Sequence, residues 1–360
     1  MNGGAGQRVD LGPLSVDAYV ATDRALLARR ARNVLPDTLT FLTFDRPGAL
    51  LGFHQSAAQE LRLDRVHELG LPIQRRLTGG GALYVEDGVF GWELFLQRSS
   101  LPQPDLAANA RALCEMAAAG LSSLGVDAKF RPRNDIEVEG RKICGTGGVQ
   151  EEDAFLYQGS VLLDFDAARM VDVLRIPVEK MRDKVVQDAR ARVTSLRALL
   201  GTRPAEGRVA DVLTAAFSRG LGVEFVPSTL TADDRHEIDG ALREVRDPEW
   251  LTQNDRPVTE TPVRQGIHRC PGGLLRVALL VDERRQRVKQ VWITGDFFVE
   301  PGRLVFDLEA ALRDIGMEQV RERIEAFFAG YPADLFGLSP TDFADAIESV
   351  LHGNARWACA

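Results

Sequence analysis

The first residues with distinctive chemistry are two arginines followed closely by three glycines. Residues 75–82 read RRLTGGGA and fall between two strand-like stretches. Glycines leave backbone N–H groups uncovered and adopt positive φ without strain, so such a loop can wrap around a phosphate or carboxylate. Guanidinium groups are planar, permanently charged donors for the same anion. The segment indicates an anion-binding loop, and the alternative is a flexible turn flanked by surface charge.

A lysine in a strand-like hairpin is the second candidate. Residues 134–148 read NDIEVEGRKICGTGG, and the alternation around Glu139-Gly140 indicates two strands joined by a turn. Lys142 shares a face with Ile136 and Val138 if this turn is wide, whereas a tight turn resets that phase. A lysine that points into a glycine-lined site can bind a carboxylate and an α-phosphate together, neutralising the charge that builds up during adenylation. The alternative is an exposed hairpin lysine.

A glycine before an apolar strand is the third feature. Residues 157–164 read YQGSVLLD. Glycine at the start of a strand often marks a bulge or the close approach of a ligand. Taken alone, the segment is explained by plain packing, and it gains a functional interpretation only beside the first two groups.

The elements that position these groups follow from hydrophobic periodicity. Helices are predicted over residues 14–32, 106–124, 167–174, 209–219, 307–315, 317–328 and 340–351, and strands over 38–44, 71–74, 89–96, 160–165, 274–281 and 288–293. This order predicts an α+β domain followed by a small α+β C-terminal domain. Residues 247–262 lack periodicity and contain several prolines, so we expect a catalytic domain over 1–250, a linker at 251–262 and an accessory domain over 263–360.

Composition narrows the classes of function. The 360 residues are 45% hydrophobic and carry 44 Lys and Arg against 52 Asp and Glu, a net charge of −8. This balance argues against nucleic acid or an anionic membrane as the main partner. The start of the chain lacks a signal-peptide pattern and no run of about 18 apolar residues occurs, so we expect a cytoplasmic protein. Four irregularly spaced cysteines indicate a reducing compartment rather than a disulfide framework or zinc site.

Together these segments resemble the lipoate-protein ligase branch of the biotin and lipoate protein ligase superfamily. The family pattern has Arg-Arg-x-Ser/Thr-Gly-Gly-Gly-Ala, then Asn-Asp-Ile with Gly-Arg-Lys-Ile-Ser-Gly, then His-x-Gly-Thr-Leu-Leu, and later Val-Thr-x-Leu. Residues 75–82, 134–145, 158–163 and 192–196 match these in order. The similarity extends upstream to residues 52–55, and residues 272–277 and 293–298 are similar to the ligase's small accessory domain. It covers nearly the whole chain.

The resemblance implies a class II synthetase-like mixed sheet flanked by helices, with the accessory domain in the same chain. It also implies a two-step reaction that uses lipoic acid, ATP and Mg²⁺. Lipoate attacks the α-phosphate of ATP to give lipoyl-AMP and pyrophosphate, and a lysine of an apo lipoyl carrier protein then takes the lipoyl group and releases AMP. The carrier is expected to be a glycine-cleavage-type, 2-oxoacid dehydrogenase-type or specialised lipoyl protein.

Residue roles come from the same resemblance. Lys142 is the catalytic residue that contacts carboxylate and phosphate, while Asn134 and Asp135 hold phosphate or magnesium, with Asp135 as the metal ligand. The substrate- and cofactor-binding residues implied are Arg75, Arg76, Thr78, Gly79, Gly80, Gly81, Ala82, Tyr84, Asn134, Asp135, Gly145, Thr146, Gly147, Gln158, Gly159 and Ser160.

The chain departs from the family pattern at two histidines and a serine. The family has an aromatic residue followed by His-Asp beyond the triple glycine, where this chain has Tyr84-Val85-Glu86. The histidine before Gly159 is likewise replaced, and Cys144 stands in place of the serine two residues after Lys142. These changes leave open an altered acyl or carrier preference.

Three other functions stay open. An octanoyl or lipoyl transferase of the same fold carries its acyl group on a cysteine that precedes the lysine, where this chain has Ala128-Lys129-Phe130. Cys144 is either a reactive thiol lowered in pKa by Lys142 or a small buried residue. A biotin ligase typically has a Gly-Arg-Gly-Arg loop, which residues 75–81 do not reproduce. A non-catalytic lipoyl-binding protein is favoured by the missing histidines and opposed by Lys142 and the glycine loop.

Overall fold

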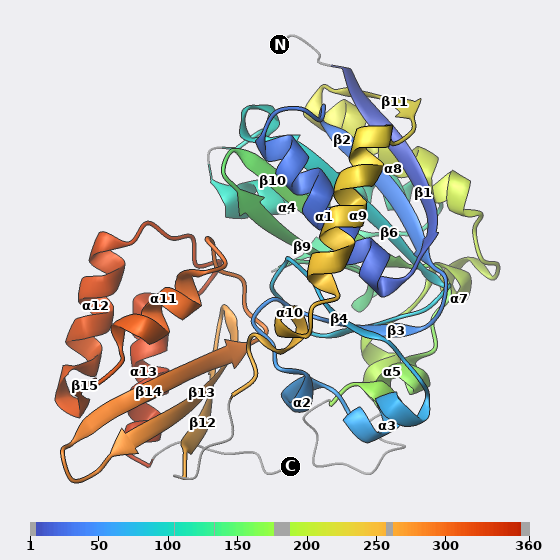
Figure 1. Ribbon diagram of the computed structural model, residues 1–360. Helices are drawn as coiled ribbons and strands as arrows, with labels where there is room; N and C mark the ends of the chain where they lie inside the picture. The colour runs from blue at the N-terminus through green and yellow to red at the C-terminus, as the bar shows by residue number, and fades with distance from the viewer. Residues whose placement is uncertain (1–4, 104, 133, 176–187, 257–261, 354–360) are drawn as a thin grey trace. The chain divides into compact units, whose positions relative to one another are not determined.

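The computed structural model describes residues 5–103, 105–132, 134–175, 188–256 and 262–353, which form two compact units (Figure 1). The first unit comprises Met1–Leu50, Leu61–Leu77 and Leu83–Leu251, and the second comprises Leu51–Glu60, Thr78–Ala82 and Thr252–Ala360. The second unit thus combines the C-terminal part of the chain with two short segments from its first third. Residues 257–261 of the expected linker lie outside the described residues.

A mixed eight-stranded sheet forms the centre of the first unit, in the order β11-β1-β2-β6-β10-β9-β8-β7. β1 runs parallel to β2 and β11, and the remaining neighbours from β2 to β7 are antiparallel. The strands of this sheet are β1 Ala5–Leu14, β2 Thr38–Phe44, β6 Val89–Gln97, β7 Lys129–Arg131, β8 Asp135–Val138, β9 Arg141–Glu151, β10 Ala154–Leu162 and β11 Glu224–Ser228. A three-stranded sheet joins β4 Ile73–Arg75, β3 Gly48–Leu51 and β5 Leu83–Val85.

Helices cover both faces of the large sheet. α1 (Val16–Ala31) lies beside α9 (Ala232–Val245), and α4 (Leu106–Ser122) lies beside α8 (Glu206–Leu221) (Figure 1). Side chains cap their first turns, as Ser15 accepts from the Ala18 amide and Asp105 from the Ala108 amide. The shorter helices are α2 Ala57–Glu60, α3 Leu63–Glu68, α5 Ala167–Val173, α7 Leu196–Leu200 and α10 Pro248–Thr252, with a 3₁₀ turn at Arg98–Ser100.

The second unit has its own antiparallel sheet and apolar core. Its strands are β12 Arg264–Cys270, β13 Gly273–Asp282, β14 Arg287–Gly295 and β15 Ile315–Gly316, in that order. Its helices are α11 Leu304–Ala311, α12 Val320–Gly330 and α13 Pro340–Leu351, with a 3₁₀ turn at Met317–Gln319. Phe297, Phe343 and Ile347 are fully buried between sheet and helices. α13 begins with a capping box between Ser339 and Asp342.

The predicted α+β class is confirmed, with a mixed sheet flanked by helices and a separate C-terminal antiparallel sheet. The helix predicted over 307–315 lies earlier in the chain, at Leu304–Ala311, and Asp314, whose φ is 54°, follows it just before β15. Within the described part of the chain, every helix is too short or too polar to span a bilayer.

Candidate functional site

Lys142 lies on a tight hairpin between β8 and β9. Glu139 (φ 53°) and Gly140 (φ 75°) both have positive φ, as the central residues of a type I′ turn require. The predicted pair of strands is confirmed, and the turn is of the tight kind. Because the register pairs Glu137 with Lys142, the lysine lies on the opposite face from the buried Ile136.

A bulge in β9 follows Lys142 and brings Gly145 to the face that carries Lys142. The β8–β9 register shifts by one residue there, and the neighbours Ile143 and Cys144 are both fully buried. Lys142 Nζ lies 2.5 Å from Asp135 Oδ1, with 30% of the lysine side chain and 22% of the aspartate side chain exposed. Gly145 makes room for this pair, since a Cβ there would lie 2.6 Å from Lys142 Nζ. The result is a defined ammonium–carboxylate contact that solvent can reach.

The Val193-Thr194 segment holds the backbone of Lys142 from the other side. The Thr194 amide donates to the Lys142 carbonyl over 2.9 Å, and Val193 forms a parallel bridge with Lys142. This segment belongs to the fourth stretch of family resemblance. Its place beside Lys142 gives that stretch a physical role, which is to fix the lysine backbone.

Several predicted binding positions share the face that carries Lys142. Across β9 and β10, Gly145 pairs with Ser160 and Gly147 pairs with Gln158. Alternate residues of a strand point to the same face, so these positions lie on one side of the sheet. From β8, Asp135 pairs with Gly145. The structure therefore brings together Asp135, Lys142, Gly145, Gly147, Gln158 and Ser160.

Thr146 and Gly159 face the opposite side of the sheet, where they pair with each other. A Cβ at Gly159 would lie 2.4 Å from the indole ring of Trp92, so only glycine fits. Asn134 accepts from the Thr146 amide over 2.8 Å through its backbone carbonyl, and its side-chain amide donates to the Thr146 carbonyl. These residues support the Lys142 face from behind.

Arg75 anchors a helix of the first unit. Its guanidinium donates to the carbonyls of Trp250, over 3.1 Å, and Leu251, over 2.5 Å. The Trp250 indole in turn donates to the Arg75 carbonyl over 3.1 Å. The side chain is fully buried, and these contacts tie β4 to α10.

Arg76 belongs to a buried polar cluster with Asp23 and Glu93. Burial raises the pKa of Asp23 well above its ordinary value, and Glu93 adds to the rise while Arg76 opposes it. Burial also raises the pKa of Glu93, which accepts from the Thr40 hydroxyl over 2.8 Å. One carboxyl group therefore keeps its proton, while the other balances the buried arginine.

The glycine-rich loop is part of the second unit. Gly80 has a φ of 88°, and its amide donates to the Phe297 carbonyl over 3.1 Å. A Cβ at Gly80 would lie 2.7 Å from the Phe298 ring, and the Thr78 carbonyl accepts from the Phe53 amide over 2.9 Å. The glycines therefore allow close packing here, while Gly81 is exposed. Ala82, which ends the loop, is partly exposed.

Tyr84 and Glu86 form a separate hydrogen-bonded pair. The buried Tyr84 hydroxyl donates to Glu86 Oε2 over 3.1 Å, and burial raises the pKa of Tyr84 to about 12. Glu86 Oε1 accepts from the Asp166 amide over 2.9 Å, just before α5. Glu86, in the segment where the family has His-Asp, thus anchors the start of a helix.

The cysteines of the first unit are both buried. Burial raises the pKa of Cys114 to about 12, and it raises the pKa of Cys144 as well, with Cys114 adding to that rise. Neither thiol is exposed or low in pKa, the two properties of reactive cysteines. Cys270 is partly exposed in the second unit, and Cys359 lies outside the described residues.

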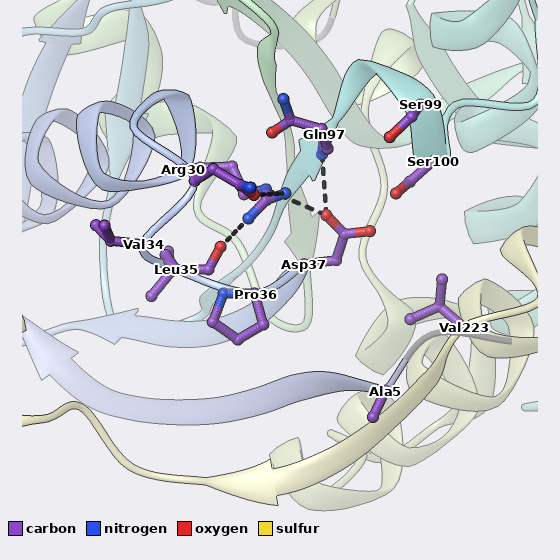
Figure 2. A pocket seen from close by; sticks show the side chains of 11 residues that line it. Ala5, Arg30, Val34, Leu35, Pro36, Asp37, Gln97, Ser99, Ser100 and Val223 are labelled. Carbon is purple, nitrogen blue, oxygen red and sulfur yellow. Dashed lines mark hydrogen bonds and ion pairs between the residues drawn. The ribbon is translucent and has the colours of Figure 1, made fainter.

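A polar hollow of about 540 Å³ lies beside α1 and is lined by residues outside the predicted site, among them Arg30, Asp37 and Gln97 (Figure 2). Figure 2 shows Arg30 bonded to Asp37 and to the Leu35 carbonyl, while the Gln97 amide donates to Asp37 over 2.9 Å. These charged groups satisfy one another within the protein.

Sequence reasoning missed the Asp23–Glu93 pair and the contacts behind the site. One signal was present, because Asp23 interrupts the apolar stripe of α1 and Glu93 interrupts the apolar β6. A charged residue inside a buried element needs a partner. Which partner it finds depends on pairing between β2, β6 and β10, which no local pattern gives.

Residues 16–218 match the family model for the Lipoyl protein ligase A/B catalytic domain. The chain belongs to this family. It is accordingly an enzyme of the lipoate ligase and octanoyltransferase kind, and the resemblance seen in the sequence is confirmed.

Relatives in this family carry two kinds of name. Octanoyltransferase LipM of Kyrpidia tusciae is 28% identical over 254 residues, which are 64% of this chain and 92% of that protein. Lipoate-protein ligase A subunit 1 of Thermoplasma acidophilum is 28% identical over 225 residues, 60% of this chain and 82% of that protein. Sequence similarity alone therefore does not separate the two activities.

Solved structures share the fold. LipL1 of P. falciparum, solved in complex with lipoate, is 15% identical, covers 97% of this chain and 100% of its own, and has a TM-score of 0.74. The bipartite lipoate protein ligase of Thermoplasma acidophilum, described with its E2 lipoyl domain, is 24% identical, covers 71% of this chain and 99% of its own, and has a TM-score of 0.63.

Proposed function

We propose that the chain is an ATP-dependent lipoate-protein ligase. In the first step, a carboxylate oxygen of lipoate attacks the α-phosphorus of ATP, which forms lipoyl-AMP and releases pyrophosphate. In the second step, the amine of a carrier lysine attacks the acyl carbon, forms an amide and releases AMP. Neither step needs a nucleophile from the enzyme, so its rate would come from positioning and fixed positive charge.

The ammonium of Lys142 is the observation that carries this proposal. The Lys142 side chain is 30% exposed, and it lies on the same face of the sheet as Gly145 and Ser160, small residues that project little from the strands. A cation held in this way can bring together the carboxylate and the α-phosphate, two anions that otherwise repel each other. Its strong tether to Asp135 over 2.5 Å keeps it in one place before substrate arrives.

The carboxylate of Asp135 suits the magnesium ion that accompanies ATP. Mg²⁺ is commonly held by one or two carboxylates together with substrate phosphates. Asp135 uses Oδ1 for Lys142, so Oδ2 lies outside that ion pair. Asp135 would hold the metal, whose positive charge would offset that of the phosphates.

The buried thiols favour the ligase over the transferase. A thioester mechanism needs an exposed, ionisable cysteine near the acyl site. Cys144 is two residues from Lys142 but fully buried, and its raised pKa keeps the thiol protonated. The described residues of the first unit contain no other cysteine than the equally buried Cys114.

The C-terminal part supports the same assignment. The LipM relative matches 64% of this chain, whereas the lipoate-bound LipL1 structure covers 97% of it. We propose that residues 1–250 form the catalytic domain, 251–262 a linker and 263–360 an accessory domain that takes part in adenylation. A lipoyl domain like the E2 domain described with the Thermoplasma ligase is the proposed carrier class.

Pyrophosphate release from lipoate and Mg-ATP tests the proposal directly. The wild-type protein should release pyrophosphate with lipoate present, and an apo lipoyl domain should then gain the mass of one lipoyl group. Lys142→Ala should abolish both while the protein stays folded, with Lys129→Ala, an exposed lysine of the same unit, as the matched control. An active Lys142→Ala variant would contradict the proposed role.

An ATP-independent octanoyltransferase is the second candidate, because relatives of this name match the chain. That enzyme would transfer octanoyl groups from an acyl carrier to a lipoyl domain without ATP. A transfer activity lost in Cys144→Ser, with no pyrophosphate released under any condition, would replace the ligase assignment.

A further inference from the structure

Tyr157 is a fully buried phenol on the side of the sheet opposite Lys142. It lies on β10 at a position where the family pattern has histidine. Its ring packs against Phe155, with centroids 5.9 Å apart, and against Trp92, with centroids 5.9 Å apart. A ring held on two sides has little freedom, so the core fixes the position of its hydroxyl oxygen.

The phenol donates a hydrogen bond to Thr146. Tyr157 Oη and Thr146 Oγ1 lie 2.6 Å apart. The Thr146 hydroxyl has a single proton, and it donates this proton to the Asn134 carbonyl over 2.9 Å. Tyr157 must therefore supply the proton of the first bond. Burial raises the pKa of Tyr157 well above its ordinary value of 10.0, so this donor stays protonated throughout the range in which enzymes work.

Thr146 fixes Asn134 through three hydrogen bonds. Its hydroxyl and its amide both donate to the Asn134 carbonyl, over 2.9 and 2.8 Å, and its carbonyl accepts from the Asn134 side chain. Asn134 directly precedes Asp135, whose carbonyl accepts from the Cys114 thiol over 3.8 Å. The peptide groups before and after Asp135 thus both accept hydrogen bonds from buried side chains, Thr146 and Cys114.

Asp135 then sets the position of the ammonium, because its carboxylate is 2.5 Å from Lys142 Nζ. We propose that Tyr157 is a positioning residue, whose hydroxyl holds Lys142 in place through Thr146, Asn134 and Asp135. The inference rests on the proposed function only for the role of Lys142 in the reaction. The chain of contacts itself crosses the sheet from the face that carries Tyr157 to the face that carries Lys142.

Removing one hydroxyl group tests the arrangement. Tyr157→Phe keeps the ring and its packing, so its effect on folding should be small. We expect kcat for pyrophosphate release to fall about 10-fold, with KM for ATP and lipoate nearly unchanged, because only the position of a reacting group is altered. Phe155→Leu is the matched control, since it disturbs the same aromatic packing and leaves every hydroxyl in place.

Two Thr146 variants separate positioning from packing. Thr146→Val keeps the shape and should lose activity as Tyr157→Phe does, whereas Thr146→Ser keeps the hydroxyl and should recover most of the kcat that Thr146→Val loses. The double variant Tyr157→Phe/Thr146→Val should be no slower than Thr146→Val alone, because both changes break one connection. A wild-type kcat in Tyr157→Phe, or a double loss equal to the product of the single losses, would overturn the proposal.

Chemical labelling gives a readout that does not depend on catalysis. Acetic anhydride labelling followed by peptide mass spectrometry compares Lys142 with the exposed Lys129 as internal reference. Tyr157→Phe and Thr146→Val should raise the labelling of Lys142 relative to Lys129 about fivefold, because each variant loses a buried hydrogen bond that helps to hold Lys142 against Asp135. Phe155→Leu should leave this ratio unchanged. Equal labelling in all variants would refute the positioning role, while absent pyrophosphate release by the wild type would refute only the ligase assignment.

Discussion

Gly145→Ala should move the Lys142 ammonium without unfolding the protein. A Cβ at this position would lie 2.6 Å from Lys142 Nζ and 2.8 Å from its Cε, but 3.9 Å from Asp135 Oδ1. Non-bonded heavy atoms are normally about 3.5–4.0 Å apart. The lysine, a flexible chain end, must therefore shift by about 1 Å, while the aspartate can stay where it is.

The expected loss follows from that shift. A displacement of about 1 Å in a catalytic group can lower the rate about 10²-fold, which corresponds to about 2.7 kcal/mol. Stability should change little, because a partly exposed ion pair contributes about 0–1 kcal/mol and alanine in a strand gains about 0.5–1 kcal/mol over glycine. Activity and stability should therefore separate in this variant.

The assay is pyrophosphate release at saturating lipoate and Mg-ATP, beside urea unfolding of the same samples. Gly207→Ala in α8 is the control, since a Cβ there meets no atom within 4 Å. It should keep the wild-type rate. Full activity in Gly145→Ala, with its fold intact, would refute the reasoning that a fixed Lys142 drives adenylation.

Three further predictions concern the pH dependence of stability at Glu309, the reactivity of Cys144 and the removal of the C-terminal part of the second unit. Burial raises the pKa of Glu309 to about 7, so its contribution to stability is complete below its unfolded pKa of about 4.3 and is lost as pH rises through 7. In urea unfolding, the free energy of unfolding of wild type should fall by about 2 kcal/mol more between pH 5 and 8 than that of Glu309→Gln. Parallel plots of unfolding free energy against pH for the two proteins would contradict this. Iodoacetamide should label Cys144 only after unfolding, and Cys144→Ser should release pyrophosphate within about threefold of wild type; rapid labelling of the native protein would argue for the transferase. Deleting residues after Pro262 should weaken adenylation, because the Gly80 amide loses the Phe297 carbonyl, and a fully active truncation would show that this loop needs no such partner.

Strongly patterned elements could be predicted from the sequence, and weakly patterned ones could not. β2 and β6 are rich in apolar and β-branched residues and lie close to the predicted positions, at Thr38–Phe44 and Val89–Gln97. β1 was missed, since only Gly6 and Val9 of its ten residues are buried and charged residues flank Val9. Its place in the sheet comes from parallel pairing with β2 and β11, distant in sequence, rather than from alternation.

The candidate site could be named from motifs but not assembled from them. Lys142 faces away from Ile136 because the turn is tight, and Gly145 shares the face of Lys142 because β9 bulges. Neither feature is fixed by alternation alone. The Arg75 guanidinium donates to carbonyls of α10, some 175 residues later in the chain. No local sequence signal therefore distinguishes an arginine that anchors a helix from one that binds substrate. Long-range pairing decides these features.

The boundary of the second unit does not coincide with a single cut in the chain. Segment Leu51–Glu60, which contains α2, belongs to it, with Glu60 3.0 Å from Arg276 and Gln59 accepting from the Thr294 hydroxyl over 2.7 Å. A chimera that exchanges only the C-terminal third between homologues would leave this segment facing a foreign surface. A chimera that preserves the second unit must therefore exchange three separate segments, Leu51–Glu60, Thr78–Ala82 and Thr252–Ala360, at the same time.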